Sequence, residues 1–416
     1  MIDLVLDACQ AAGVDEIVVV VSPSQPEVCE HLAERRGSAR VVLQHEQLGT
    51  GHAVAQVPAE QLAAGDVLVV NGDAPLLRPQ TIARLLEAHR EAAAPATLAS
   101  VHDPGRVDGR ILRAADGSLE RIVEYKDAGP ELQDAAEINV GLYCFDGPRL
   151  VEALSRLRPD NRAGELYLTD VFKELRPAQV VRMGDPEEAL GINDRVQLAE
   201  AERILRLRLL RELMLSGVTV VDPQSTFVDV GVRVGADTVL EPFTILRGAT
   251  EVGDECRIGP SVDIRDSRIG DRARIEHSWL EGVEFGSDSD CGPFAKLRPG
   301  TRIAEGVHVG SFAEVVRSSV GRGSKVPHVS YLGDTTVGEN VNIGAGTITA
   351  NFDKGVKNRT TIEDGAFIGV DTMLRAPVRV GRGARTGAGS VVTKDVPPGA
   401  TAVGVPARVL RRREAE

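Results

Sequence analysis

The sequence predicts an α/β, doubly wound domain over residues 1–193, a long linker helix over 194–218 and a left-handed parallel β-helix of hexapeptide repeats over 219–416. Three observations support this architecture. The first part alternates apolar runs with helical stretches, the next is rich in helix formers, and the last carries an aliphatic residue at every sixth position. A period of six fits neither a helix nor a flat strand, so the chain must return to one interior line once per repeat.

In the first domain the apolar runs are continuous, which is typical of parallel strands buried on both faces. We expect strands at 17–22, 41–44, 67–71, 97–101 and 139–145, with helices near 2–13, 25–35, 80–93 and 166–175. Such sheets bind ligands beyond the carboxyl ends of their strands.

Two segments of this domain have the composition of a binding site. Asp73 follows the strand expected at 67–71, where a lone carboxylate can hold Mg²⁺ against phosphate oxygens. The loop 44–53 contains Gly49 and Gly51, whose bare backbone can approach a base or a phosphate. Each signal alone is more often an ordinary turn, but their joint order along the chain is stronger.

The second and third parts are predicted from different patterns. Residues 197–218 contain no proline and end at Ser-Gly, so we predict one structural helix without chemistry of its own. In the third part the six-residue period predicts a triangular prism whose interior aliphatic residues stack from coil to coil. Aromatic residues make up 3% of the chain, against 43 glycines, which suits an aliphatic prism. A sandwich of short strands would need alternation and irregular hairpin turns instead.

Composition limits the partners. A net charge of -13 opposes general binding to nucleic acid or to an anionic membrane, and leaves small phosphorylated ligands open. No stretch is apolar enough to span a bilayer, and the N-terminus lacks the order of a signal peptide. The five cysteines are odd in number and form no CxxC pair, as in a reducing compartment. We expect a cytoplasmic protein with small-molecule substrates, no nucleic-acid partner and no membrane span.

Eight motifs, in order along the chain, resemble one bacterial family. They are QHEQLGTGHA (44–53), NGDAPL (71–76), IVEYKDA (122–128), EINVGLY (137–143), NRAGELYLTD (161–170), GINDRVQLAEAE (191–202), GPFAKLRPG (292–300) and NIGAGTITANFD (342–353). The family is the bifunctional N-acetylglucosamine-1-phosphate uridylyltransferase / glucosamine-1-phosphate N-acetyltransferase. The resemblance covers nearly the whole chain and implies a nucleotidyltransferase-like first domain, synthesis of UDP-N-acetylglucosamine, Mg²⁺ in the first domain, UTP and acetyl-CoA as co-substrates, and a homotrimer.

The resemblance also implies roles for residues in the first domain. The residues similar to uridylyltransferase substrate contacts are Gln44, Gly49, Thr50, Asn71, Gly72, Gly109, Glu124 and Asn139. Asp73 and Asn193 are similar to the metal ligands. We therefore expect magnesium to neutralise charge on the departing pyrophosphate.

In the β-helix, His328 lies in an irregular interval between two hexapeptide runs and matches the family's general base. Residues similar to the sugar-phosphate contacts are Arg298, Tyr331, Asn342 and Lys357. Residues similar to the acetyl-CoA contacts are Ala345, through its backbone N–H, and Asn351, Phe352, Val370 and Ala388. The insertion 349–360 breaks the period, and such loops on a solenoid tend to form its binding face.

The sequence departs from the family at several places. Family members open with a strand and a glycine-rich loop that grips the triphosphate, whereas this chain opens with IDLVLDACQAAGV, which matches the following helix. We expect a start codon assigned too late or an incomplete chain, and impaired uridylyl transfer. Val316 replaces a phosphate-binding lysine, and Arg317 is expected on the opposite face of its strand. Val370 replaces a serine, and the family's arginine just before VP near 405 is missing, although Arg411 to Arg413 could meet CoA phosphates.

Three other readings remain. The chain could be a non-catalytic scaffold that binds a nucleotide sugar, or a hexapeptide acyltransferase with another amino-sugar acceptor. A hexapeptide carbonic anhydrase would need zinc on His277, His308 and His328, which lack the local pairing of such a site.

Overall fold

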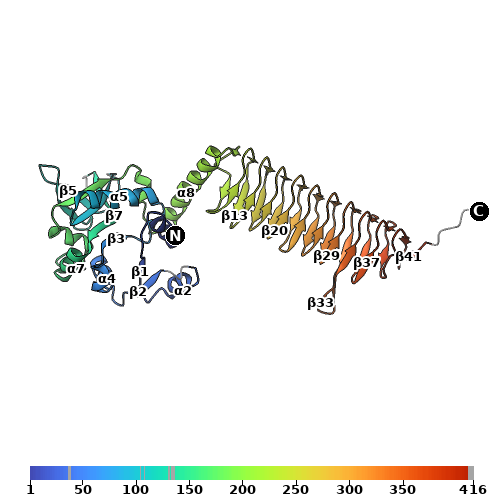
Figure 1. Cartoon of the computed structure of the whole chain (residues 1–416), viewed down its shortest axis with the longest axis horizontal. Helices are drawn as coiled ribbons and strands as arrows, with labels where there is room; N and C mark the ends of the chain where they lie inside the picture. The colour runs from blue at the N-terminus through green and yellow to red at the C-terminus, as the bar shows by residue number, and fades with distance from the viewer. Residues whose placement is uncertain (36–38, 104, 107, 130–131, 133–135, 411–416) are drawn as a thin grey trace, which may run out of the picture. The chain divides into compact units, whose positions relative to one another are not determined.

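The computed structural model describes residues 1–416 except 36–38, 104, 107, 130–131, 133–135 and 411–416. It contains two compact units, Met1–Ile204 and Leu205–Glu416. Figure 1 shows the first as a mixture of helices and strands and the second as a column of short strands. None of the described helices combines the length and the apolar character needed to cross a membrane.

The first unit alternates helices and strands, as expected. Its elements are α1 (Ile2–Ala11), β1 (Val18–Val21), α2 (Pro26–Arg35), β2 (Arg40–Leu43), α3 (Thr50–Val54), α4 (Ala59–Leu62), β3 (Asp66–Val70), α5 (Pro79–Ala92), β4 (Ala96–His102), β5 (Arg110–Arg113), β6 (Leu119–Val123), β7 (Glu137–Asp146), α7 (Gly147–Ser155), the 3₁₀ helices η1 (Leu168–Lys173) and η2 (Pro186–Ala189), β8 (Ala178–Arg182) and the start of α8 (Arg195–Leu215). The helix expected at 166–175 is therefore the shorter 3₁₀ helix η1.

The main sheet of this unit has the order β6-β5-β7-β4-β8, with β3 also paired to β7. β4 and β8 are parallel, but β7 runs antiparallel to β3, β4 and β5. The expectation that 139–145 is a parallel strand is therefore wrong. Its apolar run reports burial on both faces, and burial does not fix the direction of a central strand.

β1 and β2 form a separate two-stranded parallel sheet. Among the described residues, β1 pairs only with β2, and β3 pairs only with β7. Each thus has one edge without a strand partner in the described part of the chain.

The second unit is a parallel β-helix with three sheets, and nearly every coil contributes one strand to each. The first sheet contains β9 (Thr219–Val220), β12 (Val239–Leu240), β15 (Arg257–Ile258), β18 (Arg274–Ile275), β21 (Asp290–Cys291), β24 (His308–Ser311), β27 (Lys325–His328), β30 (Asn342–Ile343), β35 (Phe367–Ile368), β38 (Arg385–Thr386), β40 (Thr401–Val403) and the antiparallel β41 (Arg408–Val409). The second contains β10 (Phe227–Val228), β13 (Thr244–Arg247), β16 (Val262–Arg265), β19 (Trp279–Glu281), β22 (Lys296–Leu297), β25 (Glu314–Val316), β28 (Tyr331–Gly333), β31 (Ile348–Ala350), β36 (Met373–Arg375) and β39 (Val391–Val392). The third contains β11 (Arg233–Val234), β14 (Glu251–Val252), β17 (Arg268–Ile269), β20 (Val283–Phe285), β23 (Thr301–Ile303), β26 (Ser319–Val320), β29 (Thr335–Val337), β34 (Thr360–Ile362) and β37 (Val378–Val380).

The interior of the prism is the predicted aliphatic stack, with residues such as Ile258, Ile343 and Ile368 fully buried in one continuous core. The glycines that follow these residues allow the coils to approach each other. A Cβ added at Gly344 would lie 2.6 Å from the backbone C of Gly369, which no side chain could tolerate without movement. The hexapeptide glycine therefore sets the coil spacing.

One hairpin interrupts the prism. β32 (Phe352–Asp353) and β33 (Val356–Lys357) pair antiparallel between β31 and β34. We call residues 349–360, which include this hairpin, the arm. Figure 1 shows β33 projecting from the column of coils. The predicted break in the period at 349–360 is thus a hairpin.

Most turns between sheets place a residue in the left-handed conformation, and the three corners differ in composition. The first corner, between the first and second sheets, carries Phe243, Ser261, His277, Phe294, Phe312, Val329, Gly346, Asp371 and Gly389. The second corner, between the second and third sheets, carries Gly231, Gly248, Asp266, Gly282, Gly300, Arg317 and Asp334. The third corner carries Asp237, Glu255, Arg272, Asp288, Gly306, Gly323, Asn340, Gly365, Gly383 and Gly399. Large apolar residues occupy only the first.

Candidate active sites

His328 ends β27 at the first corner, and its side chain is exposed. Its carbonyl oxygen accepts a hydrogen bond from Ser330 Oγ at 2.8 Å, which fixes the turn that follows. Lys325, at the start of β27, pairs with Asn342 in the next coil. By the same register Ala345 lies one coil beyond His328, and Gly346 N donates to Val329 O at 3.1 Å.

Ala345, Val370 and Ala388 occupy the same corner position in successive coils. Asp371 N donates to Ala345 O at 2.7 Å, and Gly389 N donates to Val370 O at 2.8 Å. Within the described chain, the N–H groups of Ala345, Val370 and Ala388 themselves donate no hydrogen bond. The corner therefore presents three unused backbone donors, beginning beside His328.

The second sheet places Tyr331 and Asn351 over Gly333. A Cβ at Gly333 would lie 2.7 Å from Tyr331 Oη and 2.6 Å from Asn351 Nδ2. Asn351 is buried, and its Nδ2 donates to an oxygen of Asp334 at 2.5 Å. A glycine is needed here because two functional candidates share the space above its Cα.

The position of Arg317 differs from the expectation. β25 ends at Val316, which is 2% exposed, and Arg317 lies beyond the strand on the second corner with φ 46°. Alternation along a strand does not apply to a corner residue, so the reason given for its direction does not hold, although Arg317 is exposed where Val316 is buried. Its Nε and Nη2 donate to the two oxygens of Asp334 at 2.7 and 2.9 Å.

Of the other sugar-phosphate candidates, Asn342 lies on β30 of the first sheet, Arg298 directly follows β22 of the second sheet, and Lys357 lies on the arm. Arg298 lies one coil before Val316, and its Nη1 is 3.0 Å from Glu314 Oε1. Lys357 and Phe352 face each other across the arm hairpin, and both are exposed. Asn358 N donates to Asn351 O at 2.7 Å and closes the base of that hairpin.

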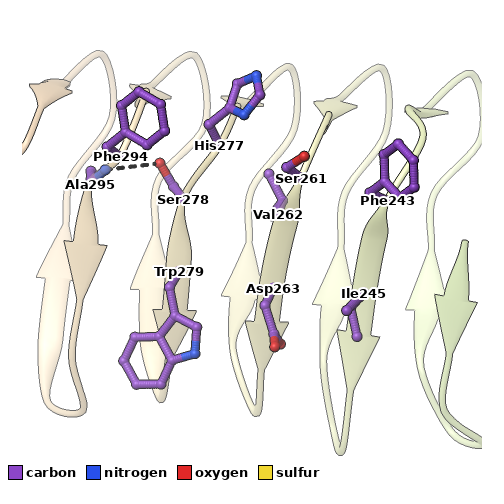
Figure 2. Close-up of a pocket in the computed structure, with 10 residues that line it drawn as sticks. All are labelled: Phe243, Ile245, Ser261, Val262, Asp263, His277, Ser278, Trp279, Phe294 and Ala295. Carbon is purple, nitrogen blue, oxygen red and sulfur yellow. Dashed lines mark hydrogen bonds between the residues drawn. The ribbon is translucent and has the colours of Figure 1, made fainter. Parts of the chain in front are cut away.

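A groove lies along the first corner, several coils before His328. Its volume is about 480 Å³, and its lining includes Phe243, His277, Trp279 and Phe294. Figure 2 shows Phe243, His277 and Phe294 along one corner, while Ile245, Asp263 and Trp279 project from the neighbouring strands. Sequence reasoning did not find this groove, because its members are a coil apart and follow no local motif.

In the first unit, the glycine-threonine loop packs against the segment 166–168. Thr50 Oγ1 accepts from Leu168 N at 3.0 Å, and a Cβ at Gly49 would lie 2.6 Å from Leu166 O. Gln44 Nε2 donates to Gly49 O at 3.2 Å. The three predicted residues of this loop therefore lie together.

The predicted sugar contacts also converge. Asn139 N donates to Gly109 O at 2.8 Å, and a Cβ at Gly109 would lie 3.5 Å from Glu124 Oε2. Glu124 accepts from Thr169 Oγ1 at 3.0 Å. Burial raises the pKa of Glu124 above its usual range, and nearby carboxylates, including Asp127, add to this effect.

The segments that carry the two metal candidates come together after β3. Ile192 N donates to Asp73 O at 3.0 Å, which brings the segment carrying Asn193 to Asp73. Burial raises the pKa of Asp73, and the charge of Asp108 raises it further. Asn71 packs beside Gly141, where a Cβ would lie 2.2 Å from Asn71 Nδ2, and Gly72 lies between Asn71 and Asp73. The sequence reading missed Asp108, Thr169 and Asp334, because each acts only through a partner distant in the chain.

The zinc reading is not supported by geometry. His277 lies against Phe294, with ring centroids 5.7 Å apart, and His308 Nδ1 is 2.6 Å from Asp290 Oδ2 on the first sheet. Within the described part of the chain, no three His, Cys, Asp or Glu side chains form a metal-binding group. The predicted contacts of Arg411 to Arg413 lie outside the described residues.

Comparison with known proteins agrees with this two-part structure. Residues 1–176 match the MobA-like NTP transferase domain family, and residues 359–394 match the bacterial transferase hexapeptide family (six repeats). The bifunctional protein GlmU of Syntrophomonas wolfei subsp. wolfei is 46% identical over 405 residues, covering 96% of this chain and 90% of that protein. The bifunctional protein GlmU of Heliobacterium modesticaldum is 49% identical over 412 residues, covering 97% and 89%.

A solved structure is also similar to part of the chain. It is the Francisella novicida UDP-N-acetylglucosamine acyltransferase, with 18% identity and a TM-score of 0.34, covering 46% of this chain and 68% of that one. This likeness is too weak to carry an argument. The domain matches confirm the predicted nucleotidyltransferase-like domain and left-handed hexapeptide β-helix. Relatives at this identity and coverage show that the chain belongs to the GlmU family of bifunctional N-acetylglucosamine-1-phosphate uridylyltransferases and glucosamine-1-phosphate N-acetyltransferases.

Proposed function

We propose that this chain acetylates glucosamine 1-phosphate at the first corner of its β-helix, and that its first unit carries the site for uridylyl transfer to the product. Together the two reactions yield UDP-N-acetylglucosamine. The observation that carries the proposal is the exposed imidazole of His328, one coil from the unused N–H of Ala345. An acyl transfer needs this combination of a base and a donor for the oxyanion.

In the acetyl transfer, His328 takes a proton from the ammonium of the sugar. The free amine attacks the thioester carbonyl carbon, an amide bond forms, and the carbon–sulfur bond breaks to release CoA. Ala345 N–H donates to the oxyanion of the tetrahedral intermediate. Phe352, Asn351, Val370 and Ala388 extend from this point along the corner and arm, where acetyl-CoA would lie.

The sugar phosphate would bind to Arg298 and Lys357, with Tyr331 and Asn342 orienting the sugar. Val316 is buried and uncharged, and the Arg317 guanidinium is already bonded to Asp334. The sugar-phosphate site therefore has fewer free cations than the resemblance to the family implies, so we expect weaker affinity for the sugar phosphate.

In the first unit, Gln44, Gly49 and Thr50 would hold the uracil, and Asn71 and Gly72 would lie beside the nucleotide. The set formed by Gly109, Glu124 and Asn139 would hold the sugar. Asp73 and Asn193 supply a carboxylate and an amide oxygen, which suit Mg²⁺ with water and phosphate as the other ligands. The raised pKa of Asp73 reflects a buried carboxylate beside a like charge, and a cation there would relieve both effects. Magnesium would neutralise charge on the phosphates.

The first corner supports a homotrimer. Phe243, Phe294, Phe312 and Val329 are 57–63% exposed there in the left-handed conformation, which is costly for bulky side chains. The rings of Phe294 and Phe312 stack 5.2 Å apart. The other two corners carry small, polar or charged residues at the same backbone position. The groove of Figure 2 runs beside this apolar row, which leads to Val329 next to His328. We propose that neighbouring copies cover the row and complete the acetyltransferase site.

The decisive experiment measures CoA release from acetyl-CoA and glucosamine 1-phosphate, and pyrophosphate release from UTP and N-acetylglucosamine 1-phosphate. We expect clear acetyl transfer, and the rate of pyrophosphate release measures uridylyl transfer by the first unit. Binding of the nucleotide sugar without either reaction would favour the non-catalytic scaffold, and acetylation of a different amino sugar would favour the other acyltransferase. The need for UTP and acetyl-CoA supports a cytoplasmic location.

A further inference from the structure

The second corner carries a carboxylate that none of these roles uses. The side chain of Asp334 is 15% exposed and receives three hydrogen bonds. Two come from the Arg317 guanidinium at 2.7 and 2.9 Å, and the third comes from Asn351 Nδ2 at 2.5 Å. Asp334 thus joins a residue of its neighbouring coil to the first residues of the arm.

The charge of Asp334 also faces the arm. The hydrogen bonds from Arg317 hold its pKa below the usual range, and Asn351 and the positive charge of Lys357 act in the same direction. The carboxylate is therefore ionised at neutral pH. Asn351 is one of the acetyl-CoA candidates, and Lys357 is one of the sugar-phosphate candidates. The Asp334 carboxylate therefore accepts a hydrogen bond from the first and attracts the positive charge of the second.

A second arginine–aspartate pair shows which part of this arrangement is ordinary. Arg272 and Asp288 lie on successive coils of the third corner, both in the left-handed conformation, with two bonds of 2.7 Å. Among the described residues, the Asp288 carboxylate accepts hydrogen bonds from Arg272 alone, and both side chains are nearly half exposed. Pairing across a corner is therefore a recurrent way to join coils, whereas the additional bond to the arm is specific to Asp334.

We infer that Asp334 is a positioning residue for acetyl transfer, which holds Asn351 and Lys357 of the arm in place while Arg317 serves as its counter-ion. This inference rests on the proposed function. Arg317 then does not take the place of the phosphate-binding lysine that Val316 replaces, because its positive charge neutralises the negative charge of Asp334. Without that offset, Asp334 would repel the phosphate that Lys357 attracts.

Kinetics of the full chain test the inference. Asp334→Asn keeps an oxygen that can accept from Asn351 but removes the charge facing Lys357. We expect the KM for glucosamine 1-phosphate to rise about tenfold, with kcat within about threefold of wild type. Asp334→Ala removes the acceptor as well, so the KM for acetyl-CoA should rise too. The matched control Asp288→Asn should leave all three constants unchanged. Equal effects of Asp288→Asn and Asp334→Asn, or an unchanged KM for both substrates in Asp334→Ala, would overturn the inference.

A second measurement does not depend on turnover. The arm contains Lys354, Lys357 and Arg359, all exposed, which are sites for trypsin. If Asp334 holds the arm, cleavage at these three sites should be several-fold faster in Asp334→Ala than in wild type, with Asp288→Asn unchanged. Equal cleavage rates would refute the positioning role even if the chain proved to have no acetyltransferase activity. If Asp334→Ala is cleaved faster but the wild-type chain has no acetyltransferase activity, the proposed function alone is refuted.

Discussion

At the scale of single residues, the acetyltransferase proposal depends on one imidazole. His328 is exposed, so its removal creates no cavity and leaves no buried partner unsatisfied. His328→Ala should lower kcat for acetyl transfer roughly 10²–10⁴-fold, the usual contribution of a general base. The melting temperature should stay at the wild-type value in a thermal unfolding experiment.

His308→Ala is the matched control for this variant. His308 lies on the same sheet one coil earlier, where its imidazole bonds to Asp290. Acetyl transfer should survive in it. A His328→Ala protein with wild-type kcat would remove His328 from the mechanism.

A second residue-scale prediction concerns pH. The folded unit binds a proton at Glu124 more tightly than the unfolded chain does, because burial raises its pKa. The free energy of unfolding therefore falls as pH rises from the ordinary glutamate value through this raised value. Glu124→Gln cannot ionise and should not lose this stability.

Thermal unfolding of the first unit between pH 4 and pH 8 checks this sign. The stability of Glu124→Gln relative to wild type should increase with pH across that window and then stay constant. Glu120→Gln, an exposed change on the same strand β6, is the matched control. A relative stability that falls with pH would contradict the raised pKa.

At the scale of elements, the spacing of the coils is the property to test. Gly344→Ala would place a Cβ 2.6 Å from backbone atoms of Gly369 and Val370 in the next coil. Overpacking of this kind costs about 1–3 kcal/mol, so denaturant unfolding of the β-helix should show a loss in this range. The coil carrying Val370 would also shift, and the KM for acetyl-CoA should rise.

Gly389→Ala separates this steric effect from backbone strain. Gly389 has φ 68° and open space around it, so alanine there meets only the cost of the left-handed conformation, about 1 kcal/mol. We expect Gly344→Ala to be the more destabilising of the two. The reverse order would mean that the coils can separate without resistance.

At the scale of the whole molecule, the sequence predicted the repeated features of the β-helix well. It predicted less well the features that depend on contacts between residues distant in the chain. The period of six placed Ile258, Ile343 and Ile368 in the core, because each repeat obeys the same local rule. The antiparallel direction of β7 was missed, since a strand buried on both faces has the same pattern either way. Arg317 was expected on the strand but lies on the corner after it, because the point where a strand ends depends on the neighbouring coil. Asp334 had no signal at all, as its partners lie in two other coils.

The last prediction concerns assembly through the first corner. An aromatic side chain exposed in the left-handed conformation is disfavoured twice, by backbone strain and by contact with water, unless a partner covers it. We expect sedimentation of the wild-type chain at micromolar concentration to give the mass of three chains. Phe312→Asp should shift the protein towards the monomer and lower acetyl transfer, because the site then loses the neighbouring copy. Glu255→Lys changes the charge at the same backbone position on the third corner and should remain trimeric. A monomeric wild type, or a Phe312→Asp protein that stays trimeric and fully active, would contradict assembly through the first corner.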